Sequence, residues 1–94
     1  MANELAEIQL FVEIIKAGNL SAAARALNSL PAAMSRAQSS LESRLGVRLV
    51  KRTSRSFEQT EEGSLFYERC QRIVAEITEA EAEASSKTGS VKDR

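Results

Sequence analysis

A proline and a glycine bound the segment that most restricts how this chain can fold. Pro31 opens the segment and Gly46 follows its end. Proline is favoured at the first position of a helix and glycine just beyond the last, so the pair predicts a helix over residues 31–45. Met34, Leu41 and Leu45 recur at spacings of seven and four and share one face of that helix, which we expect to pack on a core.

Another face of this helix is small, polar and positive. Its members recur at helical spacing in one column: Ala32, Ser35, Arg36 and Ser39. Directly before the helix, residues 19–27 are rich in alanine and predict a shorter helix that can approach another backbone closely. Two short helices joined by a tight turn are typical of a helix-turn-helix, whose second helix enters the major groove of DNA. An arginine on that helix can reach a phosphate or the edge of a guanine.

The segments on either side predict the rest of the fold. Residues 4–17 carry an apolar stripe and end at Gly18, and Asn19 can cap the next helix. The stripe consists of Ile8, Phe11, Val12 and Ile15. Residues 47–59 alternate apolar and polar around a polar turn, which predicts a hairpin with Arg52 and Arg55 at its tip. A hairpin of this size is marginal alone and must lean on the helices.

A long last helix is predicted from Thr60, a good N-cap, to about Ala84. Its apolar residues alternate spacings of four and three, which is a heptad seam. The seam consists of Phe66, Cys70, Ile73, Ile77, Ala80 and Ala84. The domain beneath is too small to cover the whole seam, so we expect a second copy of the chain to pair with it. Alternatively, the start of the seam packs on its own domain and the alanine-rich end frays.

Charge is segregated along the chain, although the 94 residues have a formal net charge of zero. From Arg25 to Arg55, seven basic residues stand against one acid, Glu42, whereas residues 1–24 and 56–94 are net acidic. A cluster of positive charge on one part of a domain is the electrostatic footprint of a phosphate-binding surface.

Composition excludes several other classes of function. The chain has no histidine and one cysteine, so Cys/His zinc sites, histidine acid–base chemistry and an internal disulfide are excluded. We therefore expect neither an enzyme nor a metal or cofactor site. No apolar run approaches the length of a membrane span, and the start Met-Ala-Asn-Glu lacks a signal-peptide core. The expectation is a soluble, cytoplasmic protein without a membrane partner.

Taken together, these motifs resemble the N-terminal DNA-binding domain of LysR-type transcriptional regulators. The matching residues are Leu10-Phe11-Val12, Gly18-Asn19-Leu20-Ser21, Ala23-Ala24, Leu27, Pro31 to Arg36, Leu41-Glu42, Leu45-Gly46-Val47, Leu49, Arg52 and Thr60 to Gly63. The resemblance covers roughly residues 5–85. It implies a mainly α fold: a winged helix-turn-helix, with three helices and a short β-hairpin wing, over residues 1–59. A linker and dimerisation helix follows at 60–85. Residues 86–94 are expected to be a flexible tail, the start of a linker to a C-terminal ligand-sensing domain that is absent here.

The resemblance also implies a partner and a set of contacts. A homodimer would bind double-stranded DNA at an interrupted palindrome, with a tetramer left open for the full-length protein, and a small-molecule effector would bind the absent domain. The residues carried over as DNA contacts are Pro31, Ala32, Ser35 and Arg36, with Arg52 and Arg55 in the wing. Ser39 shares their column, and Ser21 and Arg25 are candidates for the flanking backbone. Alternatively, Arg36 pairs with Glu42 and Arg52 braces the hairpin.

Two positions depart from the family pattern. Leu30 stands where the family usually has a polar residue that caps the third helix or reaches DNA, so the cap is lost or shifted to Ser29. Gln38 stands where the family usually has an aliphatic core residue. A buried amide without partners costs a few kcal/mol, so we expect Gln38 to bond to backbone or to tilt toward the rim.

A second class of function fits part of the sequence. The heptad seam alone would suit a helical protein-interaction module that never touches DNA. Such a module does not need the basic cluster between Arg25 and Arg55, and that cluster therefore favours the DNA-binding interpretation.

Overall fold

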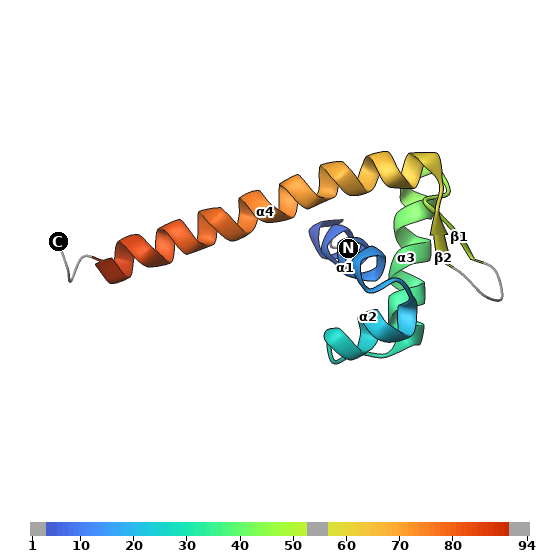
Figure 1. Cartoon of the computed structure of the whole chain (residues 1–94), viewed down its shortest axis with the longest axis horizontal. Helices are drawn as coiled ribbons and strands as arrows, with labels where there is room; N and C mark the ends of the chain where they lie inside the picture. The colour runs from blue at the N-terminus through green and yellow to red at the C-terminus, as the bar shows by residue number, and fades with distance from the viewer. Residues whose placement is uncertain (1–3, 53–56, 91–94) are drawn as a thin grey trace.

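The computed structural model describes residues 4–52 and 57–90. Along these residues run α1 (Glu4–Ala17), α2 (Leu20–Ala26), α3 (Pro31–Leu45), β1 (Val50–Arg52), β2 (Phe57–Gln59) and α4 (Glu61–Ser90). The first three helices pack on one another, and α4 crosses α1 and then projects away from them, so the molecule is 55 Å long (Figure 1). This is the predicted mainly helical class, with a hairpin wing and a long last helix.

Local signals explain where the two short helices begin and end. Asn19 caps α2, because its side-chain oxygen accepts a hydrogen bond from the N–H of Ala22 at 2.7 Å. α3 starts at Pro31 and stops at Gly46, whose φ of 72° is left-handed and easy for glycine. At the other end of α3 the cap position is held by Leu30, which makes no side-chain cap bond. Of the two alternatives expected at this position, loss of the cap or a shift to Ser29, the structure shows the loss at Leu30.

The core consists of two clusters that meet around α1. One cluster joins α1, α3, the wing and α4, and contains Phe11, Val12, Leu41, Leu49, Val50 and Cys70. The other joins α1, α2 and α3, and contains Ile14, Ala23, Ala24 and Met34. Because α1 is surrounded by three helices, it buries more than the single predicted stripe: Ile14 is fully buried, whereas Ile8 and Ile15 are only partly so.

Gln38 does not behave as predicted. Its side chain is only 1% exposed, and among the described residues neither Nε2 nor Oε1 has a hydrogen-bond partner. The expectation of a backbone bond or a tilt toward the rim was wrong. Gln38 lies one turn after Met34, which belongs to one core cluster, and three residues before Leu41, which belongs to the other. This spacing puts its side chain on the inner face of α3, between the two clusters.

The wing is tied to α3 by a carboxylate. Glu42 Oε2 accepts hydrogen bonds from the backbone N–H of Leu49 at 2.7 Å and of Val50 at 3.0 Å. β1 pairs antiparallel with β2, with Val50 opposite Gln59. The alternating pattern predicted strand pairing from Val47 onward, but regular pairing between the strands begins only at Val50. The residues before β1 bond to α3 instead of to the second strand.

The start of α4 is tied to the wing as well. Thr60 caps the helix as predicted: its Oγ1 accepts from the N–H of Gly63 at 2.9 Å and donates to the carbonyl of Arg48 at 2.6 Å. At its far end the helix extends to Ser90, so residues 86–90 are helical rather than part of the expected tail. The remainder of that tail, residues 91–94, lies outside the described residues.

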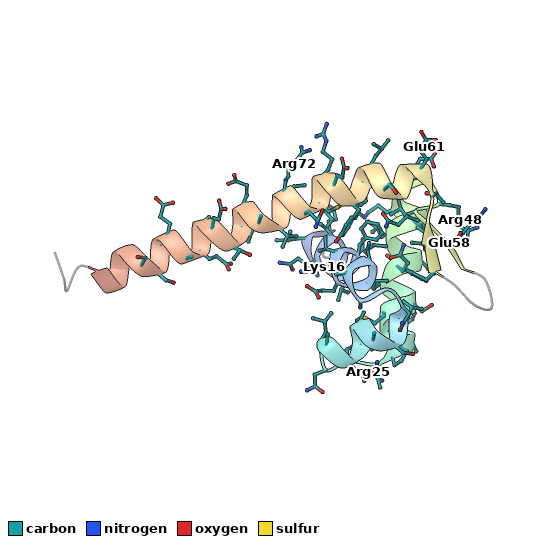
Figure 2. All side chains as sticks on the ribbon, in the orientation of Figure 1. Lys16, Arg25, Arg48, Glu58, Glu61 and Arg72 are labelled. Atoms are coloured by element: carbon teal, nitrogen blue, oxygen red, sulfur yellow. The ribbon has the colours of Figure 1, made fainter. Side chains whose placement is uncertain are left out.

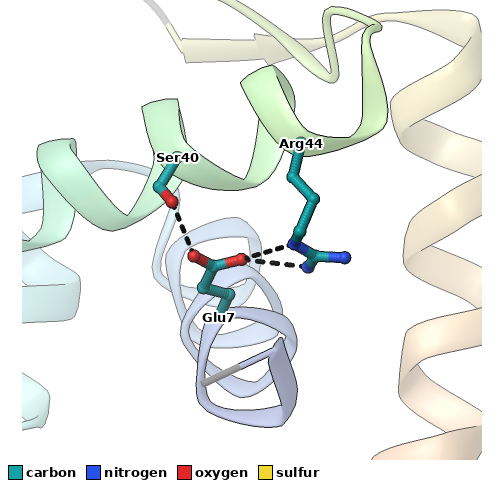
Figure 3. A network of polar contacts seen from close by, with 3 residues as sticks. All are labelled: Glu7, Ser40 and Arg44. Carbon is teal, nitrogen blue, oxygen red and sulfur yellow. Dashed lines mark hydrogen bonds and ion pairs between the residues drawn. The ribbon is translucent and has the colours of Figure 1, made fainter. Parts of the chain in front are cut away.

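A nearly buried carboxylate links α1 to α3 (Figure 3). Glu7 accepts a hydrogen bond from Ser40 Oγ at 2.7 Å and two from Arg44, from Nε at 3.1 Å and from Nη2 at 2.9 Å. The hydrogen bond from Ser40, followed by those from Arg44, lowers the pKa of Glu7 below its ordinary value of 4.5 against the opposing effect of burial. Arg44, which belongs to the basic cluster between Arg25 and Arg55, is therefore paired within the fold with Glu7, although its side chain stays 30% exposed.

This network predicts a pH-dependent contribution to stability. Because the pKa of Glu7 is lowered in the folded chain, the contribution is present above the ordinary value of 4.5 and is lost as the pH falls through the folded-state pKa. We expect Glu7→Gln to lower the free energy of unfolding by about 1.5 kcal/mol at pH 7. Urea titrations at several pH values should show the difference from the unsubstituted chain shrinking in acid. Glu4→Gln, on an exposed position of the same helix, is the control; a difference for Glu7→Gln that is independent of pH would contradict the assignment.

Candidate nucleic-acid interface

The outer face of α3 carries the column predicted to touch DNA. Pro31, Ala32, Arg36 and Ser39 are exposed, and Ser35 is half-buried. Arg36 makes no hydrogen bond or ion pair with another described residue. The alternative pairing with Glu42 is not formed, because that carboxylate bonds to the backbone before and at the start of β1. The structure therefore leaves one guanidinium standing on a surface of small side chains.

The candidates on α2 lie at the same end of the molecule as the start of α3 (Figure 1). Ser21 and Arg25 are both exposed, and Arg25 is seen on α2 at that end (Figure 2). A helix-turn-helix places its first helix across the phosphate backbone while the second enters the groove. The positions of both side chains suit that role.

The wing adds cations beside α3. Arg48 and Lys51 are exposed, and Arg48 points outward at the base of the wing (Figure 2). Both residues belong to the basic cluster between Arg25 and Arg55 but were not among the predicted contacts, although their position next to a predicted wing was an available signal. The backbone of Arg52 ends β1, but its side chain lies outside the described residues, as does Arg55 entirely. The two contacts predicted for the tip therefore stay predictions.

The seam predicted along α4 divides into two parts. Phe66 and Cys70 face their own domain: the Phe66 ring centroid lies 5.6 Å from that of Phe11, and Cys70 is 0% exposed. Cys70 thus has no surface to offer a second chain, contrary to its place in the predicted dimer seam. Burial raises the pKa of its thiol to about 11, so it stays neutral and unreactive near pH 7.

Beyond Cys70 the seam emerges from the domain. Ile73 is 44% exposed, Ile77 is half-buried, and Ala80 and Ala84 are exposed. Figure 1 shows the second half of α4 projecting past the other helices. No helix in the described part of the chain, α4 included, is both long and apolar enough to cross a membrane.

Comparison with known proteins finds relatives that are all of one kind. The model of the family described as "Bacterial regulatory helix-turn-helix protein, lysR family" matches residues 5–64. An HTH-type transcriptional regulator of Xanthomonas campestris pv. campestris (strain 8004) is 40% identical over 82 residues, which are 87% of this chain and 24% of that protein. The regulator CrgA of Neisseria meningitidis serogroup C (strain 8013) is 42% identical over 77 residues, 82% of this chain and 26% of that protein. The chain thus spans about a quarter of the length of these curated relatives.

Solved structures similar to this chain include two complexes with DNA. The BenM_DBD/catB site 1 DNA complex has a TM-score of 0.83 at 26% identity, covering 90% of this chain and 92% of that one. The CbnR_DBD-DNA complex has a TM-score of 0.81 at 28% identity, covering 94% of this chain and 99% of that one. The family model covers more than half of the chain, and the relatives and the fold agree with it. The chain therefore belongs to the lysR family of bacterial regulatory helix-turn-helix proteins.

Proposed function

We propose that this chain is the DNA-binding domain of a transcriptional regulator and inserts α3 into the major groove of double-stranded DNA. The observation that carries the proposal is the outer face of α3, where Arg36 is exposed among small side chains and pairs with no other described residue. Further exposed cations are Arg25 on α2 and Arg48 at the base of the wing (Figure 2), and Lys51 in β1. The similarity to the BenM and CbnR domains, whose structures contain DNA, supports the same conclusion.

Two kinds of contact are needed, and the surface offers both. Cations that neutralise phosphates supply affinity without regard to sequence and make binding fall steeply with salt. In this proposal Arg25, Arg48 and Lys51 take that role. Hydrogen bonds to base edges supply specificity, and arginine bonded to the O6 and N7 of guanine is the commonest such contact. In this proposal Arg36 makes that contact.

The functional unit in this proposal is a homodimer. The exposed part of the seam, from Ile73 to Ala84, would pair with its copy and hold two α3 helices at a fixed separation. A two-fold dimer of this kind reads two half-sites in successive major grooves, which corresponds to an interrupted palindrome. A C-terminal domain that binds a small-molecule effector, a possible tetramer of the whole protein and a cytoplasmic location belong to the same proposal.

Replacing Arg36 with alanine tests the assignment. An operator is first obtained by selection from a random DNA pool, and affinities are measured by band shift on this operator and on a scrambled duplex. Loss of one bidentate contact is worth about 1–3 kcal/mol per half-site, so Arg36→Ala should bind the operator at least fivefold more weakly. Affinity for the scrambled duplex should change much less.

Arg72→Ala is the matched control, because Arg72 points away from the domain on the far side of α4 (Figure 2). It removes the same charge and should leave the preference for the operator intact. Equal affinity of the unsubstituted chain for operator and scrambled DNA would sink the proposed function. An equal loss on both duplexes in Arg36→Ala would show that Arg36 contacts phosphate rather than bases.

A further inference from the structure

The most exposed large apolar side chain in the described part of the chain is Leu30, at 68%. It occupies the cap position of α3 and is followed by Pro31 and Ala32, which are also exposed. A leucine here carries a double disadvantage: it leaves the helix without a side-chain cap, and it keeps apolar surface in water. Nothing in the fold of residues 4–52 and 57–90 accounts for this exposure.

We propose that Leu30 is a specificity-determining residue that packs against the 5-methyl group of a thymine in each half-site. This inference rests on the proposed function, because it requires α3 to lie in the major groove. The residues at the start of a recognition helix are the ones that contact base edges in a helix-turn-helix. Leu30 lies at that start, beside the column that ends in Ser39.

The chemistry of the side chain selects thymine. A leucine neither donates nor accepts hydrogen bonds, and Pro31 lacks a backbone N–H, so this turn of α3 is poorly equipped to read polar base edges. The one apolar group on the edges of the bases in the major groove is the 5-methyl of thymine, which cytosine lacks. Apolar contact at the start of α3 and hydrogen bonding by Arg36 further along would then read different positions of one half-site.

The surroundings favour DNA over a protein as the occupant. Leu30 lies in the chain between Arg25 and Arg36, both exposed, and a surface that mixes a small apolar tip with flanking cations suits a polyanion. An apolar protein groove would have to bury or neutralise these charges. If thymine methyl groups prove irrelevant to binding, a protein partner becomes the alternative occupant of the Leu30 surface.

Replacing thymine by deoxyuracil tests the contact, because the two bases differ in the methyl group alone. In the selected operator, each thymine is exchanged in turn and affinity is measured for the unsubstituted chain, Leu30→Ala and Leu65→Ala. Loss of one buried methyl corresponds to about fourfold weaker binding per half-site. We expect this loss at one position of each half-site for the unsubstituted chain, and none at that position for Leu30→Ala. Leu65 is 62% exposed on α4, so Leu65→Ala makes the same chemical change elsewhere and should keep the sensitivity.

A second variant separates binding from folding. Leu30→Ser supplies a favourable N-cap, so its Tm should rise, while its sensitivity to the thymine methyl should disappear. If the unsubstituted chain selects an operator but no thymine exchange weakens binding, or if Leu30→Ala stays sensitive, the inference is overturned and the proposed function stands. If the unsubstituted chain selects no sequence at all, the proposed function fails and the inference with it.

Discussion

Replacing Gly63 with alanine should lower the free energy of unfolding by about 3 kcal/mol, the upper end of what an overpacked site loses. The first turn of α4 passes so close to the wing that a methyl group on Gly63 would overlap the carbonyl oxygen of Leu49 and lie 2.8 Å from its carbonyl carbon. In an ordinary exposed helix position the same change would stabilise the chain by about 1 kcal/mol, because alanine is the better helix former. The sign of the effect thus separates close packing from helix propensity.

The neighbouring backbone cannot move aside without breaking other contacts. The N–H of Leu49 is bonded to Glu42, and its carbonyl accepts from the N–H of Thr60 at 2.9 Å. Either α4 or the wing must therefore shift, and the position of the wing beside α3 shifts with it. Urea denaturation at a fixed protein concentration measures the loss. Ser64→Ala, at the next and exposed position, should change stability little. A Gly63→Ala chain as stable as the unsubstituted one would refute the close approach.

Replacing Gln38 with leucine should have the opposite effect and raise the free energy of unfolding by about 1–3 kcal/mol. Both polar atoms of the Gln38 side chain are buried without partners among the described residues. Their hydration is lost on folding, and no hydrogen bond within the described part of the chain replaces it. Leucine is similar in size and matches the two apolar clusters on either side, so it removes this penalty without opening a large cavity.

Denaturation midpoints of Gln38→Leu and of the matched control Gln71→Leu provide the measurement. Gln71 is exposed on α4, so its replacement should leave stability nearly unchanged. A Gln38→Leu chain that is less stable than the unsubstituted one would show that the amide is hydrogen-bonded in solution. Because Gln38 lies on the inner side of α3, Gln38→Leu should also leave the affinity for the selected operator unchanged.

Most of the secondary structure could be predicted because its signals are short-range. Pro31 and Gly46 mark the ends of α3, Asn19 caps α2, and Thr60 caps α4 through a bond to Gly63. Each signal acts within about one helical turn, so residue order alone contains it. The exposed face of α3 follows from the same periodicity, and four of its candidates are in fact exposed: Pro31, Ala32, Arg36 and Ser39.

The heptad spacing on α4 shows the limit of that reasoning. Spacing says which residues share a face, not whether the face meets the same chain or another one. Phe66 and Cys70 pack into their own core, whereas Ile73 to Ala84 emerge from it. The boundary depends on where α1 passes beneath α4, which no local pattern in α4 encodes.

Residue order by itself determined the four helices, the hairpin, the basic centre and the family, because each depends on neighbours along the chain or on recurring motifs. Only the tertiary structure decided which charged, polar and apolar side chains remain available at the surface. Arg44 is withdrawn by Glu7, 37 positions away; Gln38 is enclosed between two clusters, and Leu30 is left in water. The physical reason is that these outcomes depend on which distant segments meet in the folded chain, and packing of whole helices selects those meetings.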